Sequence, residues 1–252
     1  MSTLLISDLH LSGEQPALLA AFHRFVRERA SRSEALYILG DLYEAWIGDD
    51  DPAPWVRETI TTLSWLSKSG TALYFIHGNR DFAIGRRFAG ETGCTLLGEA
   101  HRANLHGHEV LLLHGDTLCT GDIDYQRARR WIRNPILLGI MKRLPLKARQ
   151  KIASLGRKQS VAAVRDKSGD IMDVEQATVC RTLREHGLDT MIHGHTHRPA
   201  DHRFEWQEHG ATHRGRRIVL GDWHARGWYV EASNQGLELH SFDIVNPRET
   251  TR

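Results

Sequence analysis

The chain has 252 residues, 40% hydrophobic and 25% charged, which is typical of a globular protein with one domain or two. Its three widely spaced cysteines argue against a disulfide framework and a thiolate zinc site, and they suit a reducing cytoplasm. The first ten residues lack the pattern of a secretory signal, and no apolar run approaches the roughly 20 residues of a membrane span. We therefore expect a cytoplasmic protein that at most lies on a membrane surface.

Charge is distributed unevenly along the chain. The whole chain carries a net +2, but residues 122–167 hold thirteen Lys or Arg and three Asp, a net of +10. The other 206 residues therefore carry −8. This asymmetry indicates an anionic partner near the basic segment.

Strands and helices alternate along the first half of the chain. The apolar runs predicted as strands are, in chain order, 4–7, 36–39, 72–76, 110–113 and 189–192, with further strands near RIVL, WYVEA and LELHSF in the tail. A helix is predicted from about Pro16 and another around 56–63. The apolar face of the first helix is formed by Leu18, Leu19, Phe22, Phe25 and Val26. Turns are predicted at Arg226-Gly227 and at Asn234-Gln235-Gly236, and the whole pattern predicts an α/β fold of mixed sheets with helices outside.

Polar motifs follow five of the predicted strands at the point where each strand ends. They are Asp8-Leu9-His10, Gly40-Asp41, Gly78-Asn79-Arg80-Asp81, His114-Gly115-Asp116 and His193-Gly194-His195-Thr196-His197. Open α/β sheets place their sites at the carboxyl ends of strands, so we expect these five motifs to converge on one cleft.

The motifs supply oxygen and imidazole donors and no thiolate, a set that suits Mn²⁺, Fe or Zn²⁺. The seven predicted metal ligands are Asp8, His10, Asp41, Asn79, His114, His195 and His197. Seven donors exceed the needs of one ion, so we predict two sites that share Asp41. The first site would use Asp8, His10, Asp41 and His197, and the second Asp41, Asn79, His114 and His195. Two divalent ions would hold phosphoryl oxygens and lower the pKa of a bridging water toward neutrality.

The alternative for any single histidine is a structural role. With sixteen histidines in the chain, we interpret His77, His101 and His193 in that way. A lone D-x-H or G-D motif is weak evidence, whereas five ligand-bearing motifs in this order favour a metal site.

The series D-x-H, G-D, G-N-x-D, H-G-D and G-H-x-H resembles the calcineurin-like metallophosphoesterase superfamily, and the predicted ligands occupy its motif positions. Two residues depart from the usual pattern. Glu44 stands where G-D-x-x-D has aspartate, and Arg80 stands where G-N-H-[DE] has histidine. These two departures, segment 40–51 (GDLYEAWIGDDD) and the basic insertion are all features of one branch of the superfamily. Over about residues 1–245, the chain resembles this branch, the pyrophosphohydrolases that act on UDP-2,3-diacylglucosamine.

The resemblance implies a metallophosphoesterase-type β-sandwich of mixed sheets flanked by helices, with a small helical insertion as a lid. Residues 1–121 and 168–245 would form the core, 122–167 the lid and 246–252 a tail.

The reaction that the resemblance implies belongs to lipid A biosynthesis. Water held by Asp41 between two Mn²⁺ ions would attack the α-phosphorus of UDP-2,3-diacylglucosamine, giving UMP and 2,3-diacylglucosamine 1-phosphate. The implied partners are this lipid and the anionic cytoplasmic face of the inner membrane, with peripheral association. We expect no nucleic-acid partner and no obligate protein partner.

Arg80 suits a diphosphate substrate for a chemical reason. When a pyrophosphate bond breaks, the leaving group is itself a phosphate and needs little protonation. Arginine cannot supply a proton, because its pKa exceeds about 12, but it can donate paired hydrogen bonds to phosphate oxygens. We therefore predict that Arg80 is a phosphate clamp, and the alternative is an ion pair with Asp81 outside the site.

The basic insertion contains two predicted helices. In residues 133–145 (RNPILLGIMKRLP), Asn134 is the predicted cap, Pro135 the first helical residue and Pro145 the stop. The second helix, at about 146–167, would place Arg157, Ser160, Val164 and Lys167 on one face. Beside the cleft, the two helices would form a lid with an apolar inner face and a basic rim. The alternative is a helical hairpin with a solvated basic face.

Substrate contacts follow from the resemblance. The implied positions are Asn79, Arg80, Asp122, Ser160, Lys167 and His195, and Tyr125 and Arg157 are expected to add contacts to phosphate or sugar. Some relatives have a polar residue at the position of Val164. Because the side chain of valine is apolar, it cannot form the hydrogen bond that a polar residue would make there.

Two other functions stay open, a metal-dependent nuclease and a nucleoside polyphosphate hydrolase of the same superfamily. Within the insertion only Trp131 and Tyr125 would stack on bases, which disfavours the nuclease. A polyphosphate hydrolase would have no need of an apolar lid. The seven intact ligands disfavour a scaffold without catalysis.

Overall fold

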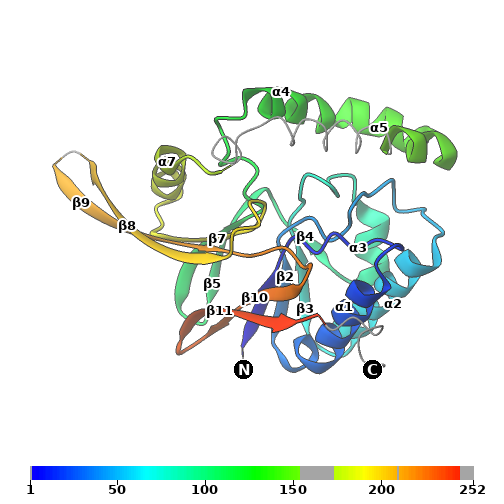
Figure 1. The fold of residues 1–252 in the computed structure, drawn as a ribbon, viewed down its shortest axis with the longest axis horizontal. Helices are drawn as coiled ribbons and strands as arrows, with labels where there is room; N and C mark the ends of the chain where they lie inside the picture. Colours follow the sequence, from blue (N-terminus) through cyan, green and yellow to red (C-terminus); the bar gives the residue numbers. More distant parts are fainter. Residues whose placement is uncertain (1, 154–172, 209, 245–252) are drawn as a thin grey trace.

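Two mixed β-sheets pack against each other in the computed structural model, which describes residues 2–153, 173–208 and 210–244 (Figure 1). The first sheet has the order β11-β10-β1-β2-β3-β4 and the second β5-β6-β7-β9-β8. The strands of the first sheet are β1 (Thr3–Ile6), β2 (Ala35–Ile38), β3 (Ala72–Phe75), β4 (Thr95–Leu96), β10 (Arg226–Ser233) and β11 (Gly236–Asp243). Those of the second are β5 (Ala100–Leu105), β6 (His108–Leu113), β7 (Thr190–His193), β8 (Ala200–Glu208) and β9 (Ala211–Val219).

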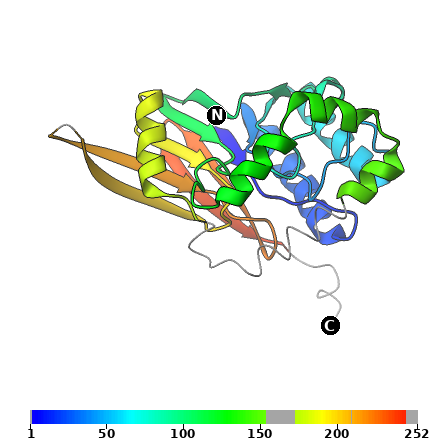
Figure 2. The same ribbon diagram turned by 90° about the horizontal axis from the view of Figure 1, so that it is seen from above.

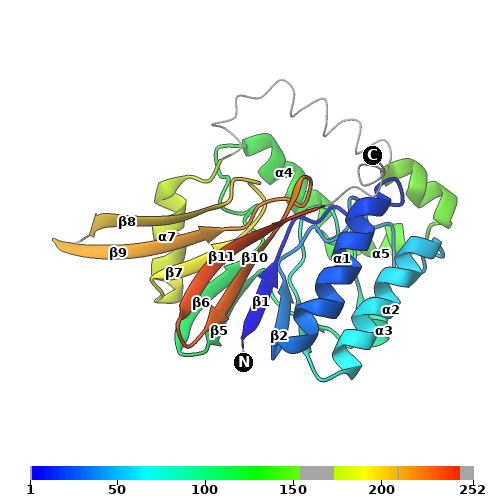
Figure 3. The ribbon, with the colours of Figure 1, turned by 60° about the horizontal axis from the view of Figure 1, so that its bottom comes forward.

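Helices cover the outer face of each sheet, as Figure 3 shows. On the first sheet lie α1 (Pro16–Glu28), the short 3-10 helix η1 (Ala30–Arg32), α2 (Pro54–Lys68) and α3 (Arg86–Thr92). On the second sheet lies α7 (Gln176–His186). The predicted fold of mixed sheets flanked by helices is therefore confirmed.

The hydrophobic pattern explains the layers. The apolar face predicted for the first helix is buried in α1, and it packs on the outer face of the first sheet. A second apolar cluster fills the space between the sheets, with Leu5 and Ile76 from one side and Leu112 and Ile218 from the other. Strands buried on both faces are what continuous apolar runs such as those at β1 and β2 predict.

Parallel pairing brings the ends of the core strands together. In the first sheet β1 pairs in parallel with β2, and β2 with β3. In the second sheet β6 pairs in parallel with β7. The carboxyl ends of these five strands therefore lie at one end of the sandwich, where the polar motifs follow them.

The described part of the basic insertion, residues 122–153, lies above this end of the sandwich, and Figure 2 shows its helices from above. It contains α4 (Ile123–Ile132), α5 (Pro135–Arg143) and a further helical stretch at 146–153. The predicted cap of α5 is confirmed, because the side chain of Asn134 accepts hydrogen bonds from the backbone N–H groups of Ile136 and Leu137. Residues 154–167 of the predicted second helix and the tail at 246–252 lie outside the described residues. Within the described ranges, no helix has the length and apolar character needed to cross a membrane.

One turn prediction is wrong and one is confirmed. Residues 234–235 connect β10 and β11, which pair as a hairpin from Ser233 and Gly236 onward. Arg226 and Gly227, in contrast, begin strand β10. The glycine is needed there for packing, because a Cβ on Gly227 would lie 2.3 Å from the Phe242 ring.

Candidate metal centre

The predicted metal ligands share an unusual backbone conformation. In the part of the chain that the structure describes, six residues other than glycine have a positive φ. Five of them are predicted ligands, namely Asp8, His10, Asp41, His195 and His197, with φ between 51° and 69°. Such left-handed conformations are costly for L-residues and concentrate at functional sites. They turn the chain sharply after β1, β2 and β7, which directs these ligand side chains into a common cleft.

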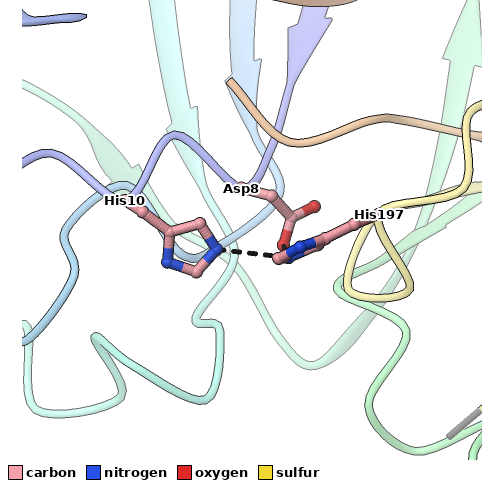
Figure 4. A group of neighbouring side chains, drawn as sticks. All are labelled: Asp8, His10 and His197. Carbon is pink, nitrogen blue, oxygen red and sulfur yellow. Dashed lines mark hydrogen bonds and ion pairs between the residues drawn. The ribbon is translucent and has the colours of Figure 1, made fainter. Parts of the chain in front are cut away.

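The first group of donors contains Asp8, His10 and His197, whose side chains face one another (Figure 4). The Nε2 atoms of His10 and His197 are 3.2 Å apart, and His197 Nε2 lies 3.5 Å from Asp8 Oδ1. Asp8 is fully buried, and its Oδ1 atom has no hydrogen-bond partner among the described residues. Its other oxygen accepts a hydrogen bond from the backbone N–H of His195 at 2.9 Å.

The second group of donors surrounds the side-chain oxygen of Asn79. His114 Nε2 and His195 Nδ1 each lie 2.9 Å from Asn79 Oδ1. The other ring nitrogen of His114 lies 2.9 Å from the carbonyl oxygen of Leu39, to which it can only donate. In a neutral His114 ring, the lone pair of Nε2 therefore points at the amide oxygen of Asn79.

Asp41 lies between the two groups. Its Oδ2 atom is 3.9 Å from His10 Nε2, and its Oδ1 atom is 3.7 Å from His114 Nε2. The backbone N–H of Arg80 donates a hydrogen bond to Oδ1 at 2.8 Å, which fixes the carboxylate. Each oxygen of this buried carboxylate thus faces a different set of imidazoles, as a bridging ligand requires.

A divalent cation fits these donors. Ligand atoms that bind one ion at about 2.1 Å lie roughly 3 Å apart, which is the spacing of the facing nitrogens and amide oxygen. The buried Asp8 Oδ1, which has no hydrogen-bond partner among the described residues and lies 3.5 Å from His197 Nε2, is a feature that a cation would relieve. The set contains oxygen and imidazole and no thiolate, in keeping with a catalytic divalent metal.

Burial and the charges within the cluster shift the pKa values of its members. Burial alone would raise the pKa of Asp8, but His197, His114 and His10 hold it well below its usual range. Burial alone would lower the pKa of His114, but Asp41, Asp8 and Asp116 raise it to about 9. Burial, with the charge of His114 beside it, lowers the pKa of His195 to about 3. The carboxylate of Asp8 therefore stays ionised and attracts cations.

A cavity of about 460 Å³ opens beside the donors. The predicted site residues on its wall are His10, Asp41, Asn79, Arg80, Asp122, Tyr125, His195 and His197. Phe82 and Ile132 add apolar surface to the same wall. Four residues of the predicted lid face, Arg157, Ser160, Val164 and Lys167, lie outside the described residues.

Arg80 does not pair with Asp81. The carboxylate of Asp81 is fully buried and accepts hydrogen bonds from the backbone N–H groups of Gly78 and Leu42, both at 2.8 Å. The guanidinium of Arg80 instead lies 3.5 Å from the carboxylate of Glu44, on the wall of the cavity. The alternative of an Arg80–Asp81 ion pair outside the site is therefore wrong.

Tyr125 is engaged inside the protein. Its hydroxyl donates a hydrogen bond to Asp116 Oδ2 at 2.9 Å, while the side chain also lines the cavity. Asp122 accepts the backbone N–H of Tyr125 and so caps α4. Both residues organise the start of the insertion.

Several basic residues of the insertion form ion pairs within the chain. Arg129 and Arg133 contact the buried Asp116, at 2.7 and 3.2 Å, and Arg149 forms two hydrogen bonds to Asp50. These three arginines therefore serve the fold, and the predicted anionic partner would meet the other basic residues of the segment. Sequence reasoning missed this role, because such pairs join segments 13 to 99 residues apart.

Comparison with known proteins gives consistent matches. The family model described as calcineurin-like phosphoesterase matches residues 1–199. A UDP-2,3-diacylglucosamine hydrolase of Ectopseudomonas mendocina (strain ymp) is 49% identical over 242 residues, 96% of this chain and 98% of that protein. One from Pseudomonas aeruginosa (strain UCBPP-PA14) is 50% identical over 244 residues, 97% and 100% of the two chains. A solved phosphoesterase from E. coli matches with a TM-score of 0.44 at 16% identity, covering 97% of this chain and 100% of that chain.

Proposed function

The chain belongs to the calcineurin-like phosphoesterase family, and from that premise we propose that it is a metal-dependent hydrolase of UDP-2,3-diacylglucosamine. The proposal depends above all on the identity of about half, across nearly the whole chain, to hydrolases that carry this substrate in their names. The donor cluster and the adjoining cavity give the chain the means for such a reaction. The products would be UMP and 2,3-diacylglucosamine 1-phosphate, a step of lipid A biosynthesis.

We propose that the two donor groups hold two divalent ions, preferably Mn²⁺. Asp8, His10 and His197 would hold one, Asn79, His114 and His195 the other, and Asp41 would contact both. Bound ions would supply positive charge to phosphoryl oxygens and make a water molecule acidic enough to act as a nucleophile near neutral pH. Asp41 would orient that water with its two fixed oxygens. Fe and Zn²⁺ suit the same donors.

Arg80 would hold the diphosphate. Its side chain lies on the cavity wall together with Asn79 and His195, and its guanidinium can bind two phosphate oxygens at once. Because the leaving group of a pyrophosphate is a weak base, the site needs charge neutralisation there more than it needs an acid. His195 and Asn79 would serve both as ligands and as substrate contacts.

The insertion would form the acyl-chain side of the site and contact the membrane. Ile132 and Phe82 give the cavity an apolar wall. On the outside of α4 and α5, Trp131 and Ile136 are each 74% exposed and Ile140 is 53% exposed. Basic side chains that the structure leaves exposed lie among them, at Arg130, Lys142 and Arg143. Apolar side chains ringed by cations favour the surface of an anionic bilayer, so we propose peripheral association with the inner membrane.

A substrate panel tests the proposal. Metal-free protein is incubated, with and without Mn²⁺, with UDP-2,3-diacylglucosamine, unacylated UDP-glucosamine, a dinucleoside polyphosphate and single-stranded DNA. We expect Mn²⁺-dependent release of UMP from the diacylated substrate, with little from the unacylated sugar nucleotide. Turnover of the polyphosphate or DNA alone would overturn the substrate and leave the metal centre standing. The same protein loaded with Fe²⁺ or Zn²⁺ identifies the preferred ion.

A further inference from the structure

The carboxylate of Glu44 lies between a predicted metal ligand and the predicted phosphate clamp. Glu44 Oε2 is 3.1 Å from Nδ1 of His10, and Glu44 Oε1 is 3.5 Å from Nη1 of Arg80. Each oxygen thus faces a different partner. Glu44 and Arg80 are also the two positions at which the sequence departs from the superfamily's usual motifs, and the structure places these departures in contact.

The backbone fixes Glu44 in this place. Its N–H donates a hydrogen bond to the carbonyl oxygen of Leu11 at 3.1 Å, next to His10 in the chain. Two residues on, the N–H of Trp46 donates to the carbonyl oxygen of Arg80 at 3.1 Å. The neighbouring Tyr43 and Trp46 are buried and anchor the segment in the core. Main-chain hydrogen bonds therefore connect the loop of Glu44 to the loops that carry His10 and Arg80.

For His10, the carboxylate determines which nitrogen faces the metal centre. Nδ1 lies 3.1 Å from Glu44 Oε2, an ion-pair distance without the angle of a hydrogen bond, and Nε2 lies 3.2 Å from Nε2 of His197. A carboxylate on the outer nitrogen of a metal-binding imidazole fixes the ring's orientation and tautomer and makes it a stronger donor.

For Arg80, the same carboxylate holds the guanidinium on the cavity wall. The carboxylate of an aspartate would lie one methylene closer to the main chain, so we expect it to lose at least one of the contacts of 3.1 and 3.5 Å that Glu44 makes. The glutamate therefore suits a site in which the clamp is an arginine.

We propose that Glu44 is a positioning residue that orients His10 toward its metal ion and Arg80 toward the substrate phosphates, and so couples metal binding to the clamp. The role of Glu44 toward His10 depends only on the metal centre. Its role toward Arg80 rests on the proposed function.

Metal binding tests the first half without any substrate. Mn²⁺ is titrated calorimetrically into metal-free wild-type protein and into the variants Glu44→Ala and Glu44→Gln, with the exposed Glu14→Gln as control. We expect one of two ions to bind about 10- to 100-fold more weakly in Glu44→Ala, with a smaller loss in Glu44→Gln, whose amide oxygen can still accept from His10. Glu14→Gln should bind both ions like wild type. Wild-type Mn²⁺ affinity at both sites in folded Glu44→Ala would overturn the proposal.

A double-mutant cycle tests the second half. The loss of kcat/KM on Arg80→Ala is measured in the wild-type and in the Glu44→Gln background, a variant of nearly unchanged size. We expect the loss to be at least about threefold smaller when Glu44 is already replaced, because the two residues act together. Fully additive losses would overturn the coupling. If no variant and no wild-type protein hydrolyses the lipid substrate, the proposed function fails while the Mn²⁺ titration still decides the role of Glu44 toward His10.

Discussion

At the scale of single residues, glycines next to the predicted ligands make room for their carboxylates. A Cβ on Gly78 would lie 2.1 Å from Asp41 Oδ1, and a Cβ on Gly194 would lie 2.0 Å from Asp8 Oδ2. Both glycines belong to the polar motifs that follow core strands. Glycine is therefore required at both positions because any side chain would collide with the neighbouring carboxylate.

Gly78→Ala should displace the carboxylate of Asp41 and with it both metal sites. We expect Mn²⁺ binding to weaken by at least about tenfold, because one ligand shared by two ions is moved. The matched control is Gly90→Ala in α3, where an added Cβ meets no atom within 4 Å and should slightly stabilise the helix. Calorimetric titration with Mn²⁺, together with a thermal melt, separates lost ligands from lost fold. Unchanged Mn²⁺ binding in Gly78→Ala would contradict the position given to Asp41.

Arg80→His restores the residue that is usual in the superfamily and tests the clamp. A histidine supplies an acid that a phosphate leaving group does not need and loses the paired hydrogen bonds, so we expect kcat/KM on the lipid substrate to fall about 10- to 1000-fold. Arg80→Lys should keep the charge and recover only part of the activity. Steady-state kinetics at saturating Mn²⁺ measures both. Undiminished turnover by Arg80→His would show that Arg80 is no clamp.

At the scale of elements, the described part of the helical insertion is anchored at two places. At its start, Arg129 and Arg133 of α4 contact Asp116, and Arg133 also donates a hydrogen bond to the carbonyl oxygen of Gly78. Farther along, Arg149 is only 5% exposed and donates hydrogen bonds to Asp50 and to the carbonyl oxygen of Ile47. Two separate anchors would hold a lid in a fixed position over the site below it.

Arg149→Met should loosen the second anchor. We expect faster amide hydrogen exchange at 146–153 and a higher KM for the lipid substrate, with Mn²⁺ affinity unchanged, because the metal ligands lie on the core loops. Lys147→Met, on an exposed neighbour in the same helical stretch, is the control. If the amides of 146–153 exchange no faster in Arg149→Met than in this control, the ion pair with Asp50 does not hold the insertion in place.

The packing of α1 on α2 predicts a pH dependence of stability. Burial lowers the pKa of His23, which lies 2.8 Å from the hydroxyl of Thr62. Below the ordinary pKa of about 6.5, the unfolded chain takes up this proton while the folded chain does not, so stability falls as the pH falls. The slope for one such group approaches about 1.4 kcal/mol per pH unit until the folded pKa is reached.

The variant His23→Gln should lose this part of the slope. Urea unfolding of metal-free protein between pH 7 and pH 5 measures the difference between wild type and variant. Parallel stability curves for the two proteins would show that His23 is protonated equally in the folded and unfolded chain.

Local pattern was enough to predict the elements that are buried or capped. The apolar face of α1 and the Asn134 cap of α5 are examples, because both depend on spacing along the chain. Strand β8 was not predicted, because its side chains are mostly exposed and its existence depends on pairing with β9. The position of Gly227 inside β10 depends on the ring of Phe242 on the neighbouring strand, which no local pattern shows.

The same distinction applies to the site. Motif order was enough to predict which donors gather at the strand ends. The contact between Glu44 and Arg80 was not predicted, although both had been noted as departures, since it joins two loops 36 positions apart. The role of Asp116 in holding α4 was missed for the same reason.

At the scale of the whole molecule, the structure divides the tasks between two parts. The core brings five strand ends together and so gathers the donors at one place, with an ordinary sandwich beneath them. The insertion lies above this place with exposed apolar and basic side chains. If the donors activate water and the exposed side chains of the insertion contact lipid, as we propose, this division suits hydrolysis of a lipid-linked diphosphate at a membrane.

Hydrolysis of UDP-2,3-diacylglucosamine in water labelled with oxygen-18 tests the central claim most directly. Mass spectrometry of both products shows which phosphorus the water attacked. We expect Mn²⁺-dependent turnover with the label in the phosphate of UMP and none in 2,3-diacylglucosamine 1-phosphate. Label in the lipid phosphate, or turnover that persists after the metal has been removed, would contradict attack of metal-activated water on the α-phosphorus.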